Sequence, residues 1–201
     1  MYSSLFNTVF VHIPKTGGQS VESLFVERHG LTWKTRAPLL LREKAPGERG
    51  PTRLAHLFAR EYVDFGYLSE DAFGRAFKFA IVRNPYDRLV SEYRYRKERQ
   101  ATDFGSFVQS LPTMKDRHLA PQTSFVQDSA GRTIVDEVLR FEALQSEFDK
   151  VAIRIFGEPV DLPRINSAQA SRPAEAADPE LRRLIYRHYE RDFDTFAYAS
   201  K

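Results

Sequence analysis

The sequence predicts a single α/β domain over residues 1–201, with a central, mainly parallel β-sheet flanked by helices. Two short apolar runs are each followed by a turn and then by a helical pattern, which is the order of elements in a parallel sheet. The chain has 201 residues and is 42% hydrophobic, which is enough for one sizeable core but not for two.

The first strand is predicted at residues 5–13, a short apolar run rich in β-branched and aromatic residues that Pro14 ends. A turn follows, and a helix begins near Gln19 and stops at Gly30. The second strand is predicted at residues 77–82. The remaining elements are predicted as short helical pieces within 54–74, a helix from Pro85 to about Gln100, a strand at 134–141, and helices at 145–156 and 180–196.

Residues 14–20, Pro-Lys-Thr-Gly-Gly-Gln-Ser, join the first strand to its helix. Because Gly17 and Gly18 lack Cβ atoms, the backbone can turn sharply and approach a ligand closely. The N–H groups of the turn and the positive end of the helix dipole then predict an anion-binding site, unless the turn is purely structural. The side chains that add charge or hydrogen-bond donors are those of Lys15, Thr16, Gln19 and Ser20.

The order of residues in this turn differs from that of the phosphate loop of Mg²⁺-dependent NTPases. In that loop, GxxxxGK[ST], the Lys follows the glycines, whereas Lys15 precedes them here. The departure argues against an ordinary Mg²⁺-dependent NTPase.

A second anion-binding motif is predicted at residues 83–91. Arg83 leaves the second strand at its carboxyl end, and its planar guanidinium suits bidentate recognition of a phosphate, although a structural Arg at the sheet edge is the alternative. Ser91 lies in the early turns of the next helix and offers a hydroxyl to the same phosphate. Ligands of such sheets bind at the carboxyl ends of the strands, where both motifs are expected to lie.

Both segments resemble the sulfotransferases, particularly the branch that modifies carbohydrates. Residues 14–20 look like that family's 5′-phosphosulfate loop, and Arg83 followed eight residues later by Ser91 looks like its 3′-phosphate motif. Weaker similarities follow at His118, Pro121-Gln122, Arg140-Phe141-Glu142, Tyr189, and Asp192-Phe193 through Tyr198, so the resemblance spans roughly residues 9–198.

The resemblance implies a P-loop-like three-layer fold and a metal-free sulfotransferase that uses PAPS (3′-phosphoadenosine 5′-phosphosulfate) as donor. The expected acceptor is a hydroxyl of a saccharide or glycoconjugate, sulfated by in-line displacement. Lys15 is then expected at the bridging and leaving oxygens, residues 16–20 at the 5′-phosphosulfate, and Arg83 with Ser91 at the 3′-phosphate. Residues 36–53, 101–133 and 157–179 are expected to be loops that shape the acceptor cleft.

A general base for the acceptor hydroxyl is sought among five histidines. His56 is the favoured base, because the carbohydrate branch has a catalytic His at a broadly similar place, and His118 is second. His12 is expected to be packed in the core. The other titratable residues considered are His29 and His188, which have no catalytic neighbour in the sequence, and Glu22 and Glu61, which are outside candidates.

Composition excludes several other classes. The chain has no cysteine, so disulfides, zinc–thiolate sites and Cys nucleophiles are ruled out. No signal peptide and no apolar run of about 18 residues is present, so we expect a cytoplasmic protein without a membrane span. The basic run at residues 94–99 is interpreted as a solvated helix face, with a nucleic-acid-binding surface and a rim that attracts an anionic glycan as the alternatives. No nucleic-acid partner is expected. The alternative functions are a P-loop-type nucleotide kinase and a non-catalytic glycan- or nucleotide-binding module.

Overall fold

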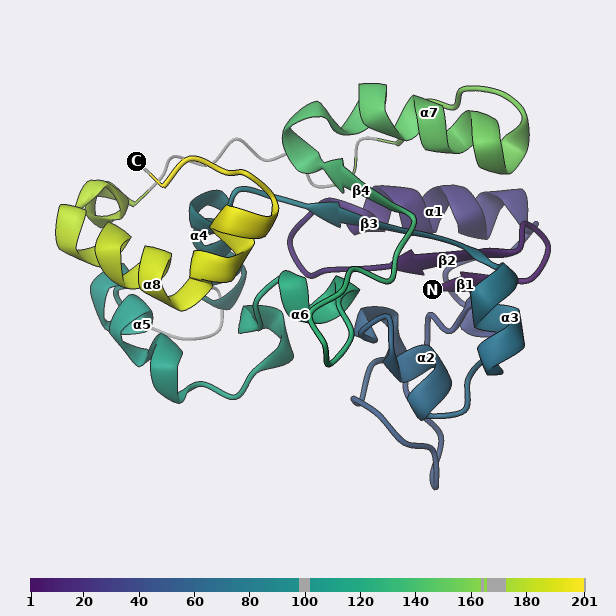
Figure 1. Cartoon of the computed structure of the whole chain (residues 1–201), viewed down its shortest axis with the longest axis horizontal. Coiled ribbons are helices and arrows are strands. Elements are labelled where there is room, and N and C mark those ends of the chain that lie inside the picture. The colour runs from purple at the N-terminus through teal and green to yellow at the C-terminus, as the bar shows by residue number, and fades with distance from the viewer. Residues whose placement is uncertain (98–101, 164, 166–172, 201) are drawn as a thin grey trace.

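A computed structural model describes residues 1–97, 102–163, 165 and 173–200. Its strands are β1 (Tyr2–Ser3), β2 (Thr8–Val11), β3 (Phe77–Val82) and β4 (Glu137–Arg140). In the described part of the chain they form one sheet in the order β1-β2-β3-β4, in which β2, β3 and β4 run parallel and β1 is an antiparallel edge (Figure 1). The predicted mainly parallel sheet is therefore confirmed.

The strand boundaries differ from prediction at the amino-terminal edge. β3 covers the predicted range, and β4 begins three residues later than the predicted 134–141 and ends one residue earlier. β2 is shorter than predicted because residues 4–7 form the turn that leads back from β1, with Asn7 in the left-handed region at φ 45°. β1 was not predicted, since two residues are too few to show an alternating pattern.

The sheet lies between two apolar layers, as expected for a three-layer fold. Phe10, Phe79 and Ile81 pack against α1 (Gly18–Arg28) and α7 (Leu144–Phe156) on one face. Alternate strand residues, including Val11 and Val82, face the other layer. That layer contains η2 (Leu54–His56), α2 (Glu61–Asp64), α3 (Glu70–Arg75) and α6 (Thr123–Val126) (Figure 1).

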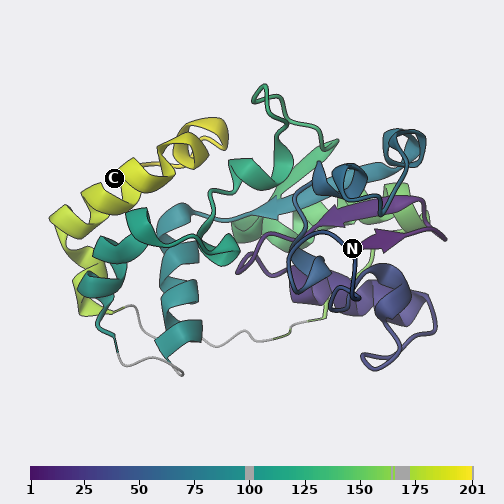
Figure 2. The ribbon, with the colours of Figure 1, turned by 90° about the horizontal axis from the view of Figure 1, so that it is seen from below.

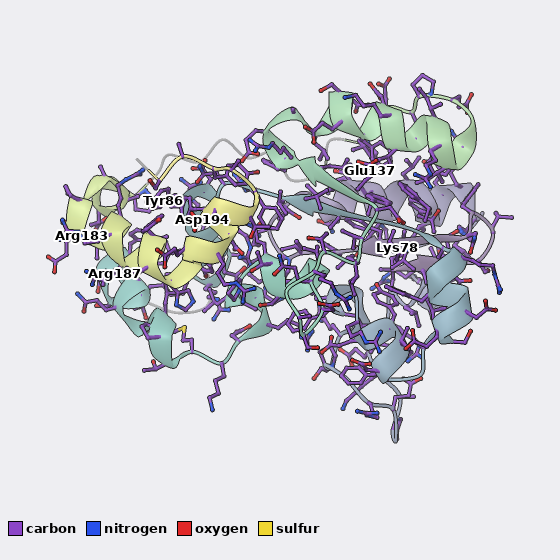
Figure 3. The ribbon with its side chains drawn as sticks, in the orientation of Figure 1. Lys78, Tyr86, Glu137, Arg183, Arg187 and Asp194 are labelled. Atoms are coloured by element: carbon purple, nitrogen blue, oxygen red, sulfur yellow. The ribbon has the colours of Figure 1, made fainter. Side chains whose placement is uncertain are left out.

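A third apolar cluster lies beyond the carboxyl end of β3, where α4 (Pro85–Lys97), α5 (Phe104–Ser110) and α8 (Pro179–Thr195) pack together (Figure 2). Tyr86 of α4 lies against α8, with its ring centroid 4.9 Å from that of Phe193 (Figure 3). The remaining short helices are η1 (Ala37–Leu39), η3 (Leu111–Thr113), η4 (Arg117–Leu119), η5 (Phe141–Ala143) and η6 (Ala174–Ala177). No helix in the described ranges is long and apolar enough to cross a membrane.

The prediction that residues 101–133 form a loop is wrong, because this segment contains α5, α6 and two short 3₁₀ helices. Phe104, Phe107 and Val108 bury one face of α5, and the Asp103 side chain caps its N-terminus by accepting from the N–H of Ser106. Apolar residues at i, i+3 and i+4 after an Asp are a helix signal that was present in the sequence.

Candidate active site

A cleft of about 1360 Å³ lies where the parallel strands β2 and β3 end. It brings together most of the residues that the two sequence motifs singled out. The predicted residues that line it are Lys15, Gly17, Gly18, Gln19, Ser20, His56, Arg83, Ser91 and His118. Thr16 is not among them: its side chain is buried, and its hydroxyl donates to the carbonyl of Ile13 at 2.8 Å. The side chain of Thr16 therefore shapes the turn and is not a donor in the cleft.

The N-terminus of α1 opens onto this cleft without a side-chain cap. Its N-cap residue is Gly17, at φ 82°, which has no side chain to accept from the first N–H groups of the helix. By contrast, α8 begins at Asp178, whose carboxylate accepts from the N–H groups of Glu180 and Leu181. The uncapped N–H groups and the helix dipole make the start of α1 suitable for an anion.

Lys15 also adopts a left-handed backbone, at φ 69°, where a side chain costs about 1 kcal/mol or more. Its ammonium lies 4.5 Å from the ring centroid of Tyr95, which in turn stacks on His118 at 6.2 Å. Tyr95 of α4 was not predicted as a site residue. It links the lysine of the first motif to His118, one of the two candidate general bases.

Both glycines of the turn are required by their neighbours, and Gly17 is required by its backbone at φ 82° as well. A Cβ on Gly17 would lie 2.8 Å from Cε2 of Phe141, and one on Gly18 would lie 2.3 Å from Cδ2 of His12. Both distances are far below ordinary contact, so any side chain would displace the turn or a ring of the cleft wall.

Arg83 is held at the cleft by its backbone and its side chain. The side-chain amide of Gln122 accepts from Arg83 N–H at 2.9 Å and donates to Arg83 C=O at 2.8 Å. The buried carboxylate of Asp192 accepts from the N–H of Gln122 at 2.7 Å and of Thr123 at 2.9 Å. The guanidinium of Arg83 donates to the Lys15 carbonyl at 3.3 Å and lies 4.3 Å from the Phe141 ring. The weaker sequence similarities at these positions thus have a physical role.

Arg88, which the sequence suggests either pairs with Asp87 or shapes the turn, is a second positioning arginine. It is 2% exposed, and it donates to the carbonyl of Pro14 at 3.1 Å and to that of His118 at 2.7 Å. One side chain of α4 therefore ties the lysine turn to the segment that carries His118. An arginine in a polar helical stretch gives no sequence signal for such a role.

Three histidines lie in a row along the cleft. The ring centroids of His12 and His56 are 4.6 Å apart, and those of His56 and His118 are 5.0 Å apart. Each ring uses Nδ1 within the protein: His12 with Glu22 at 2.6 Å, His56 with the His12 carbonyl at 3.0 Å, and His118 with Glu92 at 3.3 Å. Within the described part of the chain, none of the three Nε2 atoms has a hydrogen-bonding partner.

The environment of His56 fixes its protonation. A carbonyl can only accept, so Nδ1 carries the proton and Nε2 has the lone pair. Burial, reinforced by the neighbouring His12 and His118, holds the pKa of His56 well below its ordinary value of 6.5. His56 is therefore a neutral imidazole with a free basic nitrogen at neutral pH.

His118 has a different environment. Its partner Glu92 is 1% exposed, and burial opposes the ionised form of that carboxyl, but bonds from His118 and Arg96 outweigh it and lower the pKa of Glu92. Arg96 also pairs with Asp116 at 2.7 Å. The predicted solvated face at residues 94–99 is therefore wrong for Arg96, whose side chain is 18% exposed and lines the cleft, while residues 98 and 99 lie outside the described residues.

The other candidate acids and bases have structural partners. Glu61 accepts from Arg117 at 2.6 and 2.8 Å and lies outside the cleft lining, and Glu22 pairs with His12. His29 contacts Ser3 Oγ at 2.8 Å. His188 lies on α8 with its ring 4.6 Å from that of Tyr189. None of these replaces His56 or His118 as a base in the cleft.

The predicted acceptor loops contribute unequally to the walls. From residues 36–53 the lining residues are Arg36, Leu41, Arg42, Glu43 and Arg53; from 101–133 they are Asp116 and His118; and from 157–179 they are Asp161, Leu162, Pro163 and Ile165. Of the last segment, residues 164 and 166–172 lie outside the described residues. In the described ranges no group of three or more His, Asp or Glu side chains is arranged to hold a metal ion.

The cleft thus joins an uncapped helix N-terminus, a lysine, an arginine and a neutral histidine, which suits transfer of an anionic group to a hydroxyl. No curated protein and no solved structure matches the chain. A family model described as "Sulfotransferase family" matches residues 3–199, which is nearly the whole chain and includes both motifs. The chain therefore belongs to the sulfotransferase family and is a sulfotransferase enzyme.

Proposed function

We propose that this sulfotransferase transfers the sulfuryl group of PAPS to a hydroxyl of a saccharide or glycoconjugate by in-line displacement. The observation that carries the proposal is that two groups of residues suited to binding anions line one cleft. The start of α1 with Lys15 is one group, and Arg83 with Ser91 is the other. PAPS carries anionic groups at both its 5′ and 3′ positions, and family membership argues against the kinase and binding-module alternatives.

The residues present suit this donor. The N–H groups from Gly17 to Ser20 and the ammonium of Lys15 are suited to the 5′-phosphosulfate. Arg83 is preorganised by Gln122 for a 3′-phosphate, and Ser91 adds a hydroxyl. The volume of the cleft, about 1360 Å³, exceeds the roughly 300–1,000 Å³ of a typical single-ligand pocket, so the cleft has room for a donor and an acceptor at the same time.

The chemistry follows from the positions of three groups. The acceptor oxygen attacks sulfur as the bond from sulfur to the bridging oxygen breaks, and that bond's electron pair leaves on the 5′-phosphate oxygen of PAP. Lys15 and the α1 N–H groups stabilise the developing charge without reorganisation. His56 accepts the hydroxyl proton at Nε2, since it is neutral and in the correct tautomer. His118, oriented by Glu92, is the alternative base.

A saccharide acceptor is supported by an exposed aromatic side chain in the wall of the cleft. Trp33 lines the cleft, is 40% exposed, and has the guanidinium of Arg36 5.0 Å from its ring. An exposed indole face packs well against the C–H face of a sugar ring, and Arg36 adds a hydrogen-bond donor beside it.

Transfer from labelled PAPS to a panel of saccharides tests the proposal. The wild type is expected to release PAP and label a saccharide in the presence of a metal chelator. His56→Gln is expected to bind PAP normally but to lose most transfer, and His118→Gln separates the two base assignments. A wild-type protein that neither binds PAP nor labels any hydroxyl acceptor contradicts the proposal.

A further inference from the structure

His12 is more than the packed core histidine that the sequence predicts. It follows β2, is 8% exposed, and lines the cleft. A Cβ on Gly18 would lie 2.3 Å from its Cδ2 and 2.5 Å from its Nε2. The Cδ2–Nε2 edge of the ring therefore abuts the first residue of α1, where the N–H groups of the anion site gather.

The partner of His12 is a buried acidic side chain. Glu22 is 5% exposed, and its carboxylate lies 2.6 Å from Nδ1, so Nδ1–H donates to a buried anion. Nε2 has no hydrogen-bonding partner in the described part of the chain. A lone pair on that nitrogen would repel an anionic ligand at the start of α1, whereas a proton would bind it.

His12 also lies next to the group that the acceptor needs. Its ring centroid is 4.6 Å from that of His56, the proposed base, and its Nε2 edge touches the turn that begins with Lys15. In an in-line transfer the sulfur lies between the acceptor oxygen near His56 and the leaving oxygen near Lys15. The remaining sulfonate oxygens lie around this axis, and His12, between His56 and the turn, faces them.

We propose that His12, charged and oriented by Glu22, is a third cationic group of the donor site and donates from Nε2 to a sulfonate oxygen of PAPS. This assignment rests on the proposed function. His12 keeps its proton throughout: the acceptor proton goes to His56, and the electron pair of the broken sulfur–oxygen bond leaves with PAP. His12 therefore contacts the sulfonate group, which PAPS carries and PAP lacks.

Two substitutions at His12 separate this role from packing. Asn places its amide nitrogen near the position of Nδ1, which keeps a donor for Glu22 but removes the group at Nε2. Gln places its amide nitrogen near the position of Nε2 and retains a neutral donor there. His12→Asn is expected to lower kcat and PAPS affinity by about 10- to 100-fold and to leave PAP affinity within about threefold of wild type. His12→Gln is expected to recover part of the loss.

Glu22→Gln provides a second test that leaves the imidazole in place. It is expected to weaken PAPS binding more than PAP binding, because the neutral amide no longer stabilises the charged ring. Calorimetry measures the PAP and PAPS affinities, and initial rates give kcat, for the wild type and for the three variants. Equal losses of PAP and PAPS affinity in every variant, or unchanged kcat in both His12→Asn and Glu22→Gln, would overturn the assignment. Failure of the wild type to bind PAP instead overturns the proposed function itself.

Discussion

Substituting Gly18 by alanine tests the packing of the turn on the histidine row. The added Cβ would lie 2.3 Å from Cδ2 of His12, and ordinary contact begins at 3.4 Å, so one of the two groups must move by about 3.4 − 2.3 = 1.1 Å. His12 has little freedom to move, because it is buried between Glu22, Phe10 and His56. The displacement therefore falls on the turn and the start of α1.

The expected effects are of two kinds. Overpacking costs about 1–3 kcal/mol of unfolding free energy. Alanine has a higher helix propensity than glycine, which offsets this cost by up to about 1 kcal/mol. A displacement of about 1 Å in a catalytic constellation costs on the order of 100-fold in kcat/KM. Gly18→Ala is thus expected to lose far more activity than stability.

Gly74→Ala is the matched control, because a Cβ at this exposed position of α3 meets nothing within 4 Å. It is expected to gain about 0.5–1 kcal/mol and to keep full activity. Guanidinium unfolding and steady-state rates with PAPS measure both proteins. The reasoning is refuted if Gly18→Ala matches Gly74→Ala in stability and keeps kcat/KM within twofold of wild type.

Four further predictions concern the same site. Because neutral His56 is the active form and its pKa lies well below 6.5, wild-type kcat should stay constant as the pH falls through 6.5 and drop only in more acidic buffer; a limb centred at or above 6.5 contradicts this. The unfolded state takes up that proton first, so stability should fall on acidification below 6.5 in wild type and less in His56→Gln, as pH-dependent unfolding measures. Asp192→Asn should lose about 2–3 kcal/mol of unfolding free energy in denaturant and weaken PAP binding, because the Asp192 carboxylate holds the segment whose Gln122 binds the backbone of Arg83. The control Asp194→Asn, at an exposed position (Figure 3), should change that free energy by less than about 0.5 kcal/mol; equal effects of the two substitutions would show that the Asp192–Gln122 contact is not needed. Lys15→Ala should reduce kcat by about 100- to 1,000-fold while PAP affinity falls less, and parallel losses in both would show that Lys15 serves binding alone.

The parts of the fold with strong local patterns were predictable. β3 is a six-residue apolar run ended by a polar turn, and α1 and α7 carry apolar residues at helical spacing before a glycine. β1 was missed, because a two-residue edge strand exists only through its pairing with β2. Residues 101–133 were misassigned because their many polar residues obscured the short apolar stripe of α5.

The candidate site was predictable where function rests on backbone turns and short motifs. The lysine turn and Arg83 with Ser91 lie at strand ends, and general rules place them in one cleft. The supporting contacts come from residues distant in sequence, as with Asp192 acting through Gln122 and Arg88 joining Pro14 to His118. Long-range hydrogen bonds of this kind leave no periodic signal in the chain.

The selectivity for a 3′-phosphate tests the central claim, a PAPS-specific donor site, most directly. Calorimetry should compare PAP with adenosine 5′-phosphate, which differs only by lacking that phosphate, in the wild type and in Arg83→Ala. We expect the wild type to prefer PAP by at least about 10-fold, as one or two charge-assisted hydrogen bonds provide, and Arg83→Ala to bind the two nucleotides nearly equally. Equal affinity of the wild type for both nucleotides would contradict the assignment of PAPS as donor.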